Sequence, residues 1–226
     1  MKVTILNGTT KNPLQTIGER AGICWGGNIS NKEKNIKRAI DCITSGHGRV
    51  LEYVSIEFVV EDISARAVRE LYTHIAGGPT RLQSSTRYIN YDNFEYYTPT
   101  GNPELKNLYK EAMQSAAHYY KLLIEEGMSK EDAANLLPLG MNTKVVMKTN
   151  LRMVENLMGQ RLCTRAYKEM REFAMKLNNE LYNVDSEWRE IANNLFVPKC
   201  KKVGYCTETK CCGLSEKKEI NWVVEV

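Results

Sequence analysis

The sequence predicts an α+β fold that is rich in helix. Most of its apolar periodicity has helical spacing, and only a few short stretches are rich in the β-branched and aromatic residues typical of strands. These strands do not alternate with helices, so a doubly wound parallel sheet is not expected. Neither GxGxxG nor GxxxxGK[ST] occurs in the chain, so a nucleotide or flavin would be bound without the common glycine-rich loops.

The composition is that of a globular protein, with 42% hydrophobic and 26% charged residues among 226. A formal net charge of +4 is too small to indicate nucleic acid as the main partner. No apolar run approaches the roughly eighteen residues of a membrane span, and the N-terminus does not resemble a signal peptide. We therefore expect a cytoplasmic protein with no membrane partner and with reduced cysteines, of which Cys24, Cys42 and Cys163 should be largely buried.

Two strands and a helix are expected in the first sixty residues. The strands are predicted at residues 2–6 and 52–60, which are rich in β-branched side chains. Ser30 and Glu33 have the spacing of a capping box, so the helix should begin there and end at Gly46.

A second helix and a long loop should follow. Ser64 should cap a helix from Ala65 to about Ala76, which Gly77-Gly78-Pro79 would end. The polar, tyrosine-rich residues 80–97 predict a long ordered loop or a loop with short strands, and loops of this length often carry function.

The C-terminal half should be mostly helical. Proline suits the first turn of a helix, so a long helix is predicted from Pro103 to Gly127. Its buried stripe should comprise Leu105, Leu108, Ala112, Met113, Ala116, Tyr120 and Leu123. The remaining elements are expected as a short helix from Ser129, a strand over residues 139–148, two helical segments within 151–182 and a helix over 186–195.

The densest group of candidate binding residues lies between Arg66 and Tyr88. Its helical part should place Glu70, Thr73 and His74 on one face, with Ile75 on the other. The loop that follows contains Arg81, Gln83, Ser84, Ser85, Thr86 and Arg87. A phosphate and a polar heterocycle need such a mixture of guanidinium, hydroxyl and amide groups. We therefore favour a ligand site over a solvated, salt-bridged surface.

A second group interrupts an apolar helical stretch. It contains Asn150, Arg152, Asn156, Arg161 and Arg165. Asparagine is uncommon inside helices because its amide competes for backbone hydrogen bonds, which suggests a binding role. Surface ion pairing is the alternative for each arginine. A third, looser candidate is the segment from His47 to Arg49, where flanking glycines would let a ligand approach the backbone.

Residues 199–226 are rich in Lys and Cys, and we expect them to form a tail to a domain of residues 1–198. Four cysteines, Cys200, Cys206, Cys211 and Cys212, lie within thirteen residues. A structural zinc site is one interpretation. Because the spacing lacks paired CxxC knuckles, we favour a mobile thiol-bearing tail and predict no metal site.

The segment THIAGGPTRLQSSTRY, residues 73–88, resembles the signature of flavin-dependent thymidylate synthases. Here Thr73-His74-Ile75 replaces an Arg-His-Arg run, a variant similar to a divergent, Firmicutes-like branch. Three further motifs occur in the family's order: His47 to Glu52, Leu137-Pro138-Leu139, and Asn150-Leu-Arg152 with Asn156 and Arg161. The resemblance covers residues 20–198. It implies a helix-rich fold with a small, mostly antiparallel sheet, and an obligate homotetramer with sites between subunits.

The resemblance also implies residue roles. Arg161 would be catalytic, favouring loss of the uracil N3 proton, and dUMP would be bound by Glu70, Gln83, Ser84, Ser85, Thr86, Arg87 and Arg161. FAD would be bound by Arg49, Thr73, His74, Ile75, Arg81, Gln83, Asn150, Arg152 and Asn156. Ala134 stands where the family usually has an arginine for the dUMP phosphate.

The implied reaction is the reductive methylation of dUMP to dTMP. 5,10-Methylenetetrahydrofolate would donate the carbon, and NADPH would reduce FAD. Two alternatives remain open at this point. One is a related flavoenzyme acting on another pyrimidine nucleotide, as Ala134 would permit. The other is a non-catalytic nucleic-acid-binding protein with a zinc tail.

Overall fold

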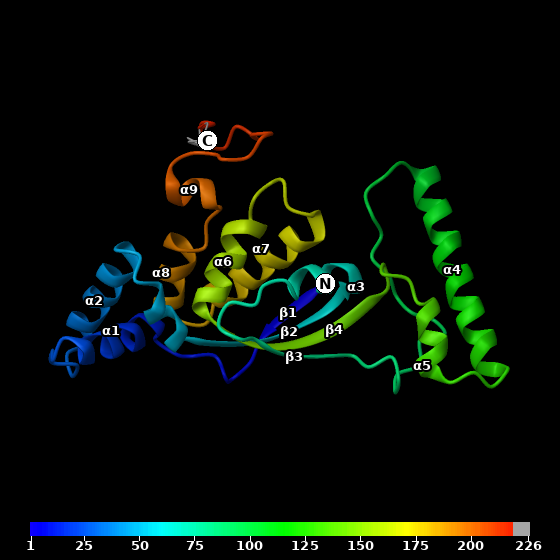
Figure 1. Cartoon of the computed structure of the whole chain (residues 1–226), viewed down its shortest axis with the longest axis horizontal. Coiled ribbons are helices and arrows are strands. Elements are labelled where there is room, and N and C mark those ends of the chain that lie inside the picture. The colour runs from blue at the N-terminus through cyan, green and yellow to red at the C-terminus, as the bar shows by residue number, and fades with distance from the viewer. Residues whose placement is uncertain (219–226) are drawn as a thin grey trace, which may run out of the picture.

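A four-stranded antiparallel sheet forms the centre of the computed structural model, which describes residues 1–218 (Figure 1). The strands lie in the order β1 (Lys2–Ile5), β2 (Ser55–Ser64), β4 (Asn142–Asn150) and β3 (Thr80–Gln83), and each neighbouring pair is antiparallel. The predicted α+β fold, with a small antiparallel sheet and abundant helix, is confirmed.

The helices are grouped in three places around this sheet (Figure 1). Helices α6 (Leu151–Arg161), α7 (Lys168–Tyr182) and α8 (Ser186–Asn194) lie on one side of it. One end carries α1 (Pro13–Cys24), α2 (Lys32–Thr44) and the 3₁₀ segment η1 (Gly48–Tyr53), and the other carries α4 (Pro103–Glu125), α5 (Lys130–Ala133) and the 3₁₀ segment η2 (Ala134–Leu136). Helix α3 (Ala65–Leu71) continues from β2, and α9 (Lys199–Val203) begins the tail. Among residues 1–218, no helix is long and apolar enough to span a lipid bilayer.

The main core lies between the sheet and the helices α6 to α8. Alternate residues of β2 are buried, as expected for a strand with one face against the core. Phe58 of β2 packs on Phe173 of α7 with 5.8 Å between the ring centroids. Trp188 of α8 is fully buried, and its indole N–H donates to the carbonyl of Thr10 at 2.8 Å. Burying such a side chain stabilises the fold by roughly 2–3 kcal/mol.

A buried carboxylate joins α7 to the start of α3. Glu169 has no exposed surface, and its two oxygens accept from the backbone N–H and the hydroxyl of Ser64, both at 2.6 Å. The Ser64 hydroxyl oxygen in turn accepts from the backbone N–H of Ala67 at 3.1 Å and so caps α3. Tyr167 adds a third hydrogen bond to Glu169 at 3.2 Å. This arrangement fixes the helix that carries Glu70.

Several predicted boundaries are wrong for local reasons. Helix α2 is capped by Asn31, whose side chain accepts from the N–H of Lys34, and not by Ser30. The strand predicted at 52–60 begins only at Ser55, because the preceding residues form η1. Helix α3 ends at Leu71 and not near Ala76, because the N–H groups of residues 73 and 74 bond three residues back and tighten the turn.

Two helices, α1 and α9, had no predicted counterpart, and two cysteines are more exposed than expected. Helix α1 begins with Pro13, a favoured first residue, and buries Leu14, Ile17 and Ala21 at helical spacing. Of the three cysteines expected to be largely buried, only Cys42 is, since Cys24 is exposed at the end of α1 and Cys163 is half-buried. The other predicted elements correspond to β1, β4 and α4 to α8 with small shifts.

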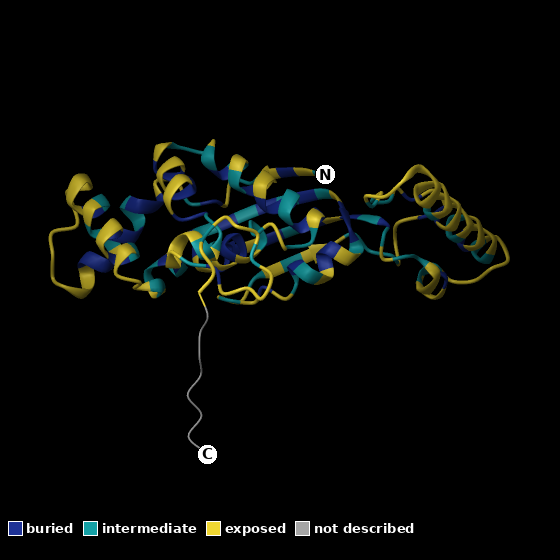
Figure 2. Ribbon diagram, turned by 90° about the horizontal axis from the view of Figure 1, so that it is seen from above, coloured by how far each residue is buried: buried dark blue, intermediate teal, exposed yellow. Residues whose placement is uncertain are grey.

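Helix α4 buries only part of the predicted stripe, since Ala116 and Leu123 are partly buried and three other members are exposed. Met113 and Tyr120 are buried with Tyr91 and Phe94 in a second, small core. Leu105, Leu108 and Ala112 were expected to be buried but are exposed. Much of α4 is coloured as exposed in Figure 2. The single chain therefore leaves one apolar side of its longest helix uncovered.

Candidate functional site

Arg161, Glu70 and His74 form one connected cluster, although 91 and 87 residues separate the first from the other two. Arg161 ends α6, and its guanidinium donates to the carboxylate of Glu70 at 2.6 Å. Its Nε also donates to Nε2 of His74 at 3.0 Å. The Glu70 and Arg161 side chains are only 20% and 17% exposed, so this pair is screened less by solvent than a surface pair. The cluster fixes the plane of the Arg161 guanidinium.

His74 accepts this hydrogen bond as a neutral imidazole. It is 4% exposed, and burial together with the positive charge of Arg161 lowers its pKa from 6.5 to about 4. The sequence placed Ile75 on the face opposite the polar residues, but Ile75 is 69% exposed and His74 is buried. The cause is the end of α3 at Leu71, after which the chain no longer keeps helical periodicity.

Replacing His74 with glutamine should reduce the acid sensitivity of the fold. Because the folded-state pKa lies below the unfolded value, the unfolded state gains the proton first as the pH falls. The stability contributed by neutral His74 is complete above about pH 6.5 and is lost progressively towards about pH 4. Over this interval, the free energy of urea unfolding should fall by on the order of 2 kcal/mol more for the wild type than for H74Q. Parallel pH curves for the two proteins would contradict a buried neutral imidazole.

The turn after α3 lies directly against the start of α6. Asn150 caps α6 by accepting from the N–H of Met153 at 3.0 Å. Gly77 has φ +74°, and a Cβ atom at this position would lie 1.8 Å from the Asn150 amide nitrogen. Glycine is therefore required here both by the backbone conformation and by the close approach. This contact places the residue 73–79 turn beside the polar start of α6.

Residues 81–84 pair along β4 and are partly ordered by aromatic and amide contacts. Arg81 donates to the carbonyl of Tyr72 at 2.9 Å and lies 4.2 Å above its ring centroid. The Tyr72 hydroxyl donates to the side-chain oxygen of Gln83 at 3.2 Å, and the Gln83 amide donates to Thr143 at 3.3 Å. The backbone N–H of Ser84 donates to the backbone carbonyl of Lys144 at 2.9 Å. Tyr72 was not among the predicted site residues, although its aromatic ring supports Arg81.

The loop turns away from Arg161 after Ser84. Ser85 and Thr86 are half-buried, and the Ser85 hydroxyl accepts from the N–H of Arg87 at 3.2 Å. The Arg87 guanidinium pairs with Glu131 of α5 at 3.0 Å, at the end of the molecule that carries α4. Within one chain, the predicted dUMP residues therefore divide between the Arg161 cluster and the 85–87 loop.

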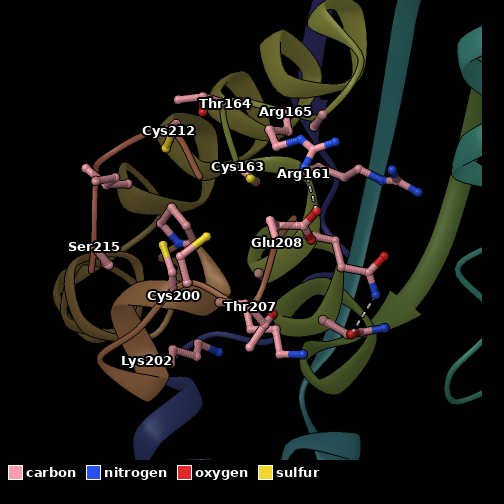
Figure 3. Close-up of a pocket in the computed structure, with 18 of the residues that line it drawn as sticks. Arg161, Cys163, Thr164, Arg165, Cys200, Lys202, Thr207, Glu208, Cys212 and Ser215 are labelled. Atoms are coloured by element: carbon pink, nitrogen blue, oxygen red, sulfur yellow. Dashed lines mark hydrogen bonds and ion pairs between the residues drawn. The ribbon is translucent and has the colours of Figure 1, made fainter. Parts of the chain in front are cut away.

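Arg152 and Asn156 of α6 line a cavity. Figure 3 shows this cavity in close-up. Its volume is about 900 Å³, and Arg161 contributes to the same lining. Arg152 is paired with Glu52 at 2.5 Å, while Asn156 accepts from Gln160 at 3.1 Å. Arg49 is 85% exposed and lies 3.9 Å from Glu52. The cavity thus gathers two residues of the predicted flavin set, Arg152 and Asn156. The other seven lie outside its lining: Arg49, Thr73, His74, Ile75, Arg81, Gln83 and Asn150.

The tail forms the other wall of this cavity. Residues 199–218 form α9 and a loop closed by a bridge between Cys206 and Lys217, whereas a mobile tail was favoured from the sequence. Glu208 of the loop pairs with Arg165 at 3.2 Å (Figure 3). No sequence signal indicated that the tail would line the site. In residues 1–218, no three His, Cys, Asp or Glu side chains are grouped so that they could hold a metal ion. The last part of the expected tail, residues 219–226, lies outside the described residues.

Comparisons with known proteins agree on one family. A family model described as "Thymidylate synthase complementing protein" matches residues 5–185. A flavin-dependent thymidylate synthase from Pyrococcus furiosus is 32% identical over 227 residues, with 92% of this chain and 90% of that protein covered. The enzyme of the same name from Geobacter sulfurreducens is 30% identical, with 78% and 80% covered. Thymidylate synthase X from Helicobacter pylori, solved with FAD and dUMP, has a TM-score of 0.70 at 19% identity and covers 87% of this chain.

Proposed function

Because the chain belongs to the flavin-dependent thymidylate synthase family, we propose that it binds FAD and converts dUMP to dTMP. The structural observation that carries this proposal is the contact of Arg161 with Glu70 and His74. It joins the 73–88 segment and the α6 motif, the two segments on which the resemblance mainly rests. Family membership favours an enzyme, and the alternative of a non-catalytic nucleic-acid-binding protein receives no support from the relatives.

The residues around the cavity fit an anionic cofactor. Arg152 and Asn156 line it together with Gln160, so donors are available for phosphate oxygens and for ring carbonyls. We propose that FAD contacts Arg49, Thr73, His74, Ile75, Arg81, Gln83, Asn150, Arg152 and Asn156. When bound and reduced by NADPH, FAD would supply the hydride that completes the methyl group derived from 5,10-methylenetetrahydrofolate. The protein's own contribution is binding, alignment and charge stabilisation.

Arg161 is proposed to act on the pyrimidine. Its guanidinium is held in a fixed plane by Glu70 and by neutral His74, so it needs little reorganisation before it contacts a planar ring. A positive charge beside the uracil ring favours loss of its N3 proton and stabilises negative charge as it develops. The rest of the proposed dUMP site is Glu70, Gln83, Ser84, Ser85, Thr86 and Arg87. A small pocket beside Glu70 is also lined by Arg66, Arg69 and Leu139, which offers further positive charge for a phosphate.

The proposed function is tested by the visible spectrum of the purified protein and by product analysis. We expect bound flavin, and dTMP formation from dUMP when methylenetetrahydrofolate and NADPH are present. Parallel assays with dCMP and UMP test the alternative of another pyrimidine substrate. Folded protein that binds neither FAD nor a deoxyuridine nucleotide would contradict the proposal.

We further propose that the enzyme is a homotetramer in which α4 packs against another copy. Leu105, Leu108, Ala112, Ser115, Tyr119 and Leu122 recur at intervals of three and four residues, the spacing of a helix-packing seam. Leu105 and Leu108 are 60% and 64% exposed. An uncovered apolar stripe of this kind marks an interaction surface. A second subunit would also bring its own 85–87 loop near a neighbouring active site, which would reunite the divided dUMP residues.

The double variant L105E/L108E should therefore reduce assembly. Charged side chains in an apolar helix seam lose hydration without gaining a partner, so dissociation into smaller species is expected at micromolar concentrations. Light scattering coupled to gel filtration measures the mass directly. Lys106→Glu is the matched control, because Lys106 is exposed and lies outside the stripe. An unchanged mass for the double variant would exclude this face from the interface.

A further inference from the structure

Five of the seven cysteines lie in or beside the tail that covers α6. Cys163, Cys200, Cys206 and Cys212 all line the 900 Å³ cavity, and Cys211 is adjacent to Cys212. The labelled sulfurs of Cys163, Cys200 and Cys212 surround one hollow (Figure 3). Neither the proposed reaction nor the sequence resemblance assigns a role to these thiols.

The loop that carries the tail cysteines is held in a defined conformation. The N–H of Cys206 donates to the carbonyl of Glu216 at 2.7 Å, and the N–H of Lys218 donates to the carbonyl of Cys206 at 3.0 Å. Arg165 binds Glu208 at 3.2 Å and the carbonyl of Lys210 at 3.3 Å. At the base of the tail, Lys202 pairs with Glu155 at 2.6 Å. The 206–216 loop is thus closed at its ends and anchored to the protein at its middle.

Within this loop Cys206 and Cys211 are neighbours, because the N–H of Cys206 bonds to Glu216, which directly follows the residue that the Cys211 thiol contacts. Cys211 also donates to the carbonyl of Ser215 at 3.2 Å and accepts from the N–H of Gly213 at 3.4 Å, so its side chain is directed into the loop. Cys206 is 7% exposed, whereas Cys211 is half-buried and reachable from solvent. The Cys211 thiol is therefore accessible from solvent, and the Cys206 thiol lies behind it in the same loop.

We propose that Cys206 and Cys211 are a redox-active dithiol that a small disulfide oxidises to an intramolecular disulfide. The Cys211 thiolate attacks one sulfur of the small disulfide, forms a mixed disulfide and releases one small thiol. The Cys206 sulfur then attacks the Cys211 sulfur and releases the second small thiol. The protein loses two electrons and two protons, and the small disulfide gains them. The new bond would close residues 206–211 into a ring and hold Glu208 over Arg165.

The surroundings favour this pair over the other cysteines. The N–H of Glu208 favours the Cys206 thiolate, but burial and the adjacent Cys211 thiol together raise the pKa of Cys206. A raised pKa suits the thiol that reacts second, because a thiol with a higher pKa is less reactive at neutral pH. The hydroxyl of Thr164 and the N–H of Leu214 lower the pKa of Cys212, which lies beside Thr164 in the loop after α6 (Figure 3). Cys212 is thus the main competitor, because a lower pKa makes a thiol more reactive at neutral pH. Disulfide formation is also favoured over metal binding by these cysteines. In residues 1–218 no three His, Cys, Asp or Glu side chains are grouped so that they could hold a metal ion.

The proposal is tested by tryptic mapping of the assembled protein after treatment with oxidised glutathione. Trypsin cleaves after Lys202, Lys210 and Lys217, so Cys206 falls in peptide 203–210 and Cys211 in peptide 211–217. After the remaining thiols are blocked with N-ethylmaleimide, we expect these two peptides to be joined and to have lost two hydrogens. The count of free thiols should fall from seven to five per chain.

Matched variants identify the partner of Cys206. Cys212→Ser should keep the joined peptides, Cys211→Ser should lose them, and Cys24→Ser should change nothing in the tail. The Cys211→Ser variant also serves if Cys206→Ser does not fold, because Cys211 is partly exposed. Glutathione found at Cys212 or Cys24, with Cys206 and Cys211 both still blocked by N-ethylmaleimide, would overturn the proposal. One tightly bound zinc per chain in the reduced protein, protecting these thiols from glutathione, would overturn it as well.

Discussion

Replacing Arg161 with alanine is expected to lower the rate of dTMP formation by about a hundredfold to a thousandfold, the range for loss of one charge-stabilising group. The guanidinium is the proposed contact for the pyrimidine, and within residues 1–218 no other arginine is bonded to both Glu70 and His74. Bound flavin should be largely retained, because Asn150, Arg152 and Asn156 are unchanged. The measurement is product formation at saturating dUMP, with flavin content determined from the visible spectrum of the same preparation.

Two controls separate charge from geometry. Arg161→Lys keeps the charge but loses the planar, bidentate donor, so we expect only partial recovery of the rate. Arg165→Ala, four residues further along in the loop after α6, removes a partner of Glu208 and should leave the rate within a few-fold of wild type. Near wild-type activity in Arg161→Ala would show that this arginine does not act on the substrate.

Replacing Glu169 with alanine is expected to destabilise the fold by about 3–5 kcal/mol, the cost of breaking a buried, hydrogen-bonded charge network. The change would leave the N–H and hydroxyl of Ser64 without their acceptors in a site that water does not reach. Urea unfolding at fixed protein concentration measures the loss. Because the same contact anchors α3, Glu70 should also be displaced. Activity should therefore fall even at urea concentrations below the unfolding midpoint.

A nearby carboxylate provides the comparison. Glu172 lies one turn further along α7 and pairs with Lys168 at 3.8 Å on the surface. Glu172→Ala should cost less than about 1 kcal/mol, as expected of an exposed ion pair. Equal losses for Glu169→Ala and Glu172→Ala would show that the contact with Ser64 does not support the fold.

The sequence predicted most elements because their signals are local. These signals act within a few residues, and each identified its helix or strand. They are the cap at Ser64, the first-turn proline at position 103 and the apolar, β-branched residues of β2 and β4. Tertiary contacts decided what local signals could not. The stripe around Leu108 was expected to be buried because helical periodicity marks an apolar face without saying whether the rest of the chain covers it.

Three residues that the structure brings into contact were named from the sequence, but their arrangement could not be predicted. The resemblance to known motifs selected Glu70, His74 and Arg161, but helical periodicity put Ile75 and not His74 inside. Glu169 and Tyr72 carry no sequence signal, since an isolated acidic or aromatic residue on an amphipathic helix usually faces solvent or core without a special role. The wall formed by the tail depends on contacts across about fifty residues, such as that between Lys202 and Glu155, which no local pattern encodes.

The small core beneath α4 has a consequence for how the protein behaves on dilution. That core is made of few buried residues. It packs α4 mainly on α5 and η2, which are themselves short. A unit of this size has little independent stability, so its amide hydrogens should exchange faster with solvent than those of α6 and α7. Subunit docking would then complete the folding of this end of the molecule. The fraction of molecules in which this end is folded would then increase with protein concentration, by mass action. The apparent melting temperature would rise with protein concentration as well.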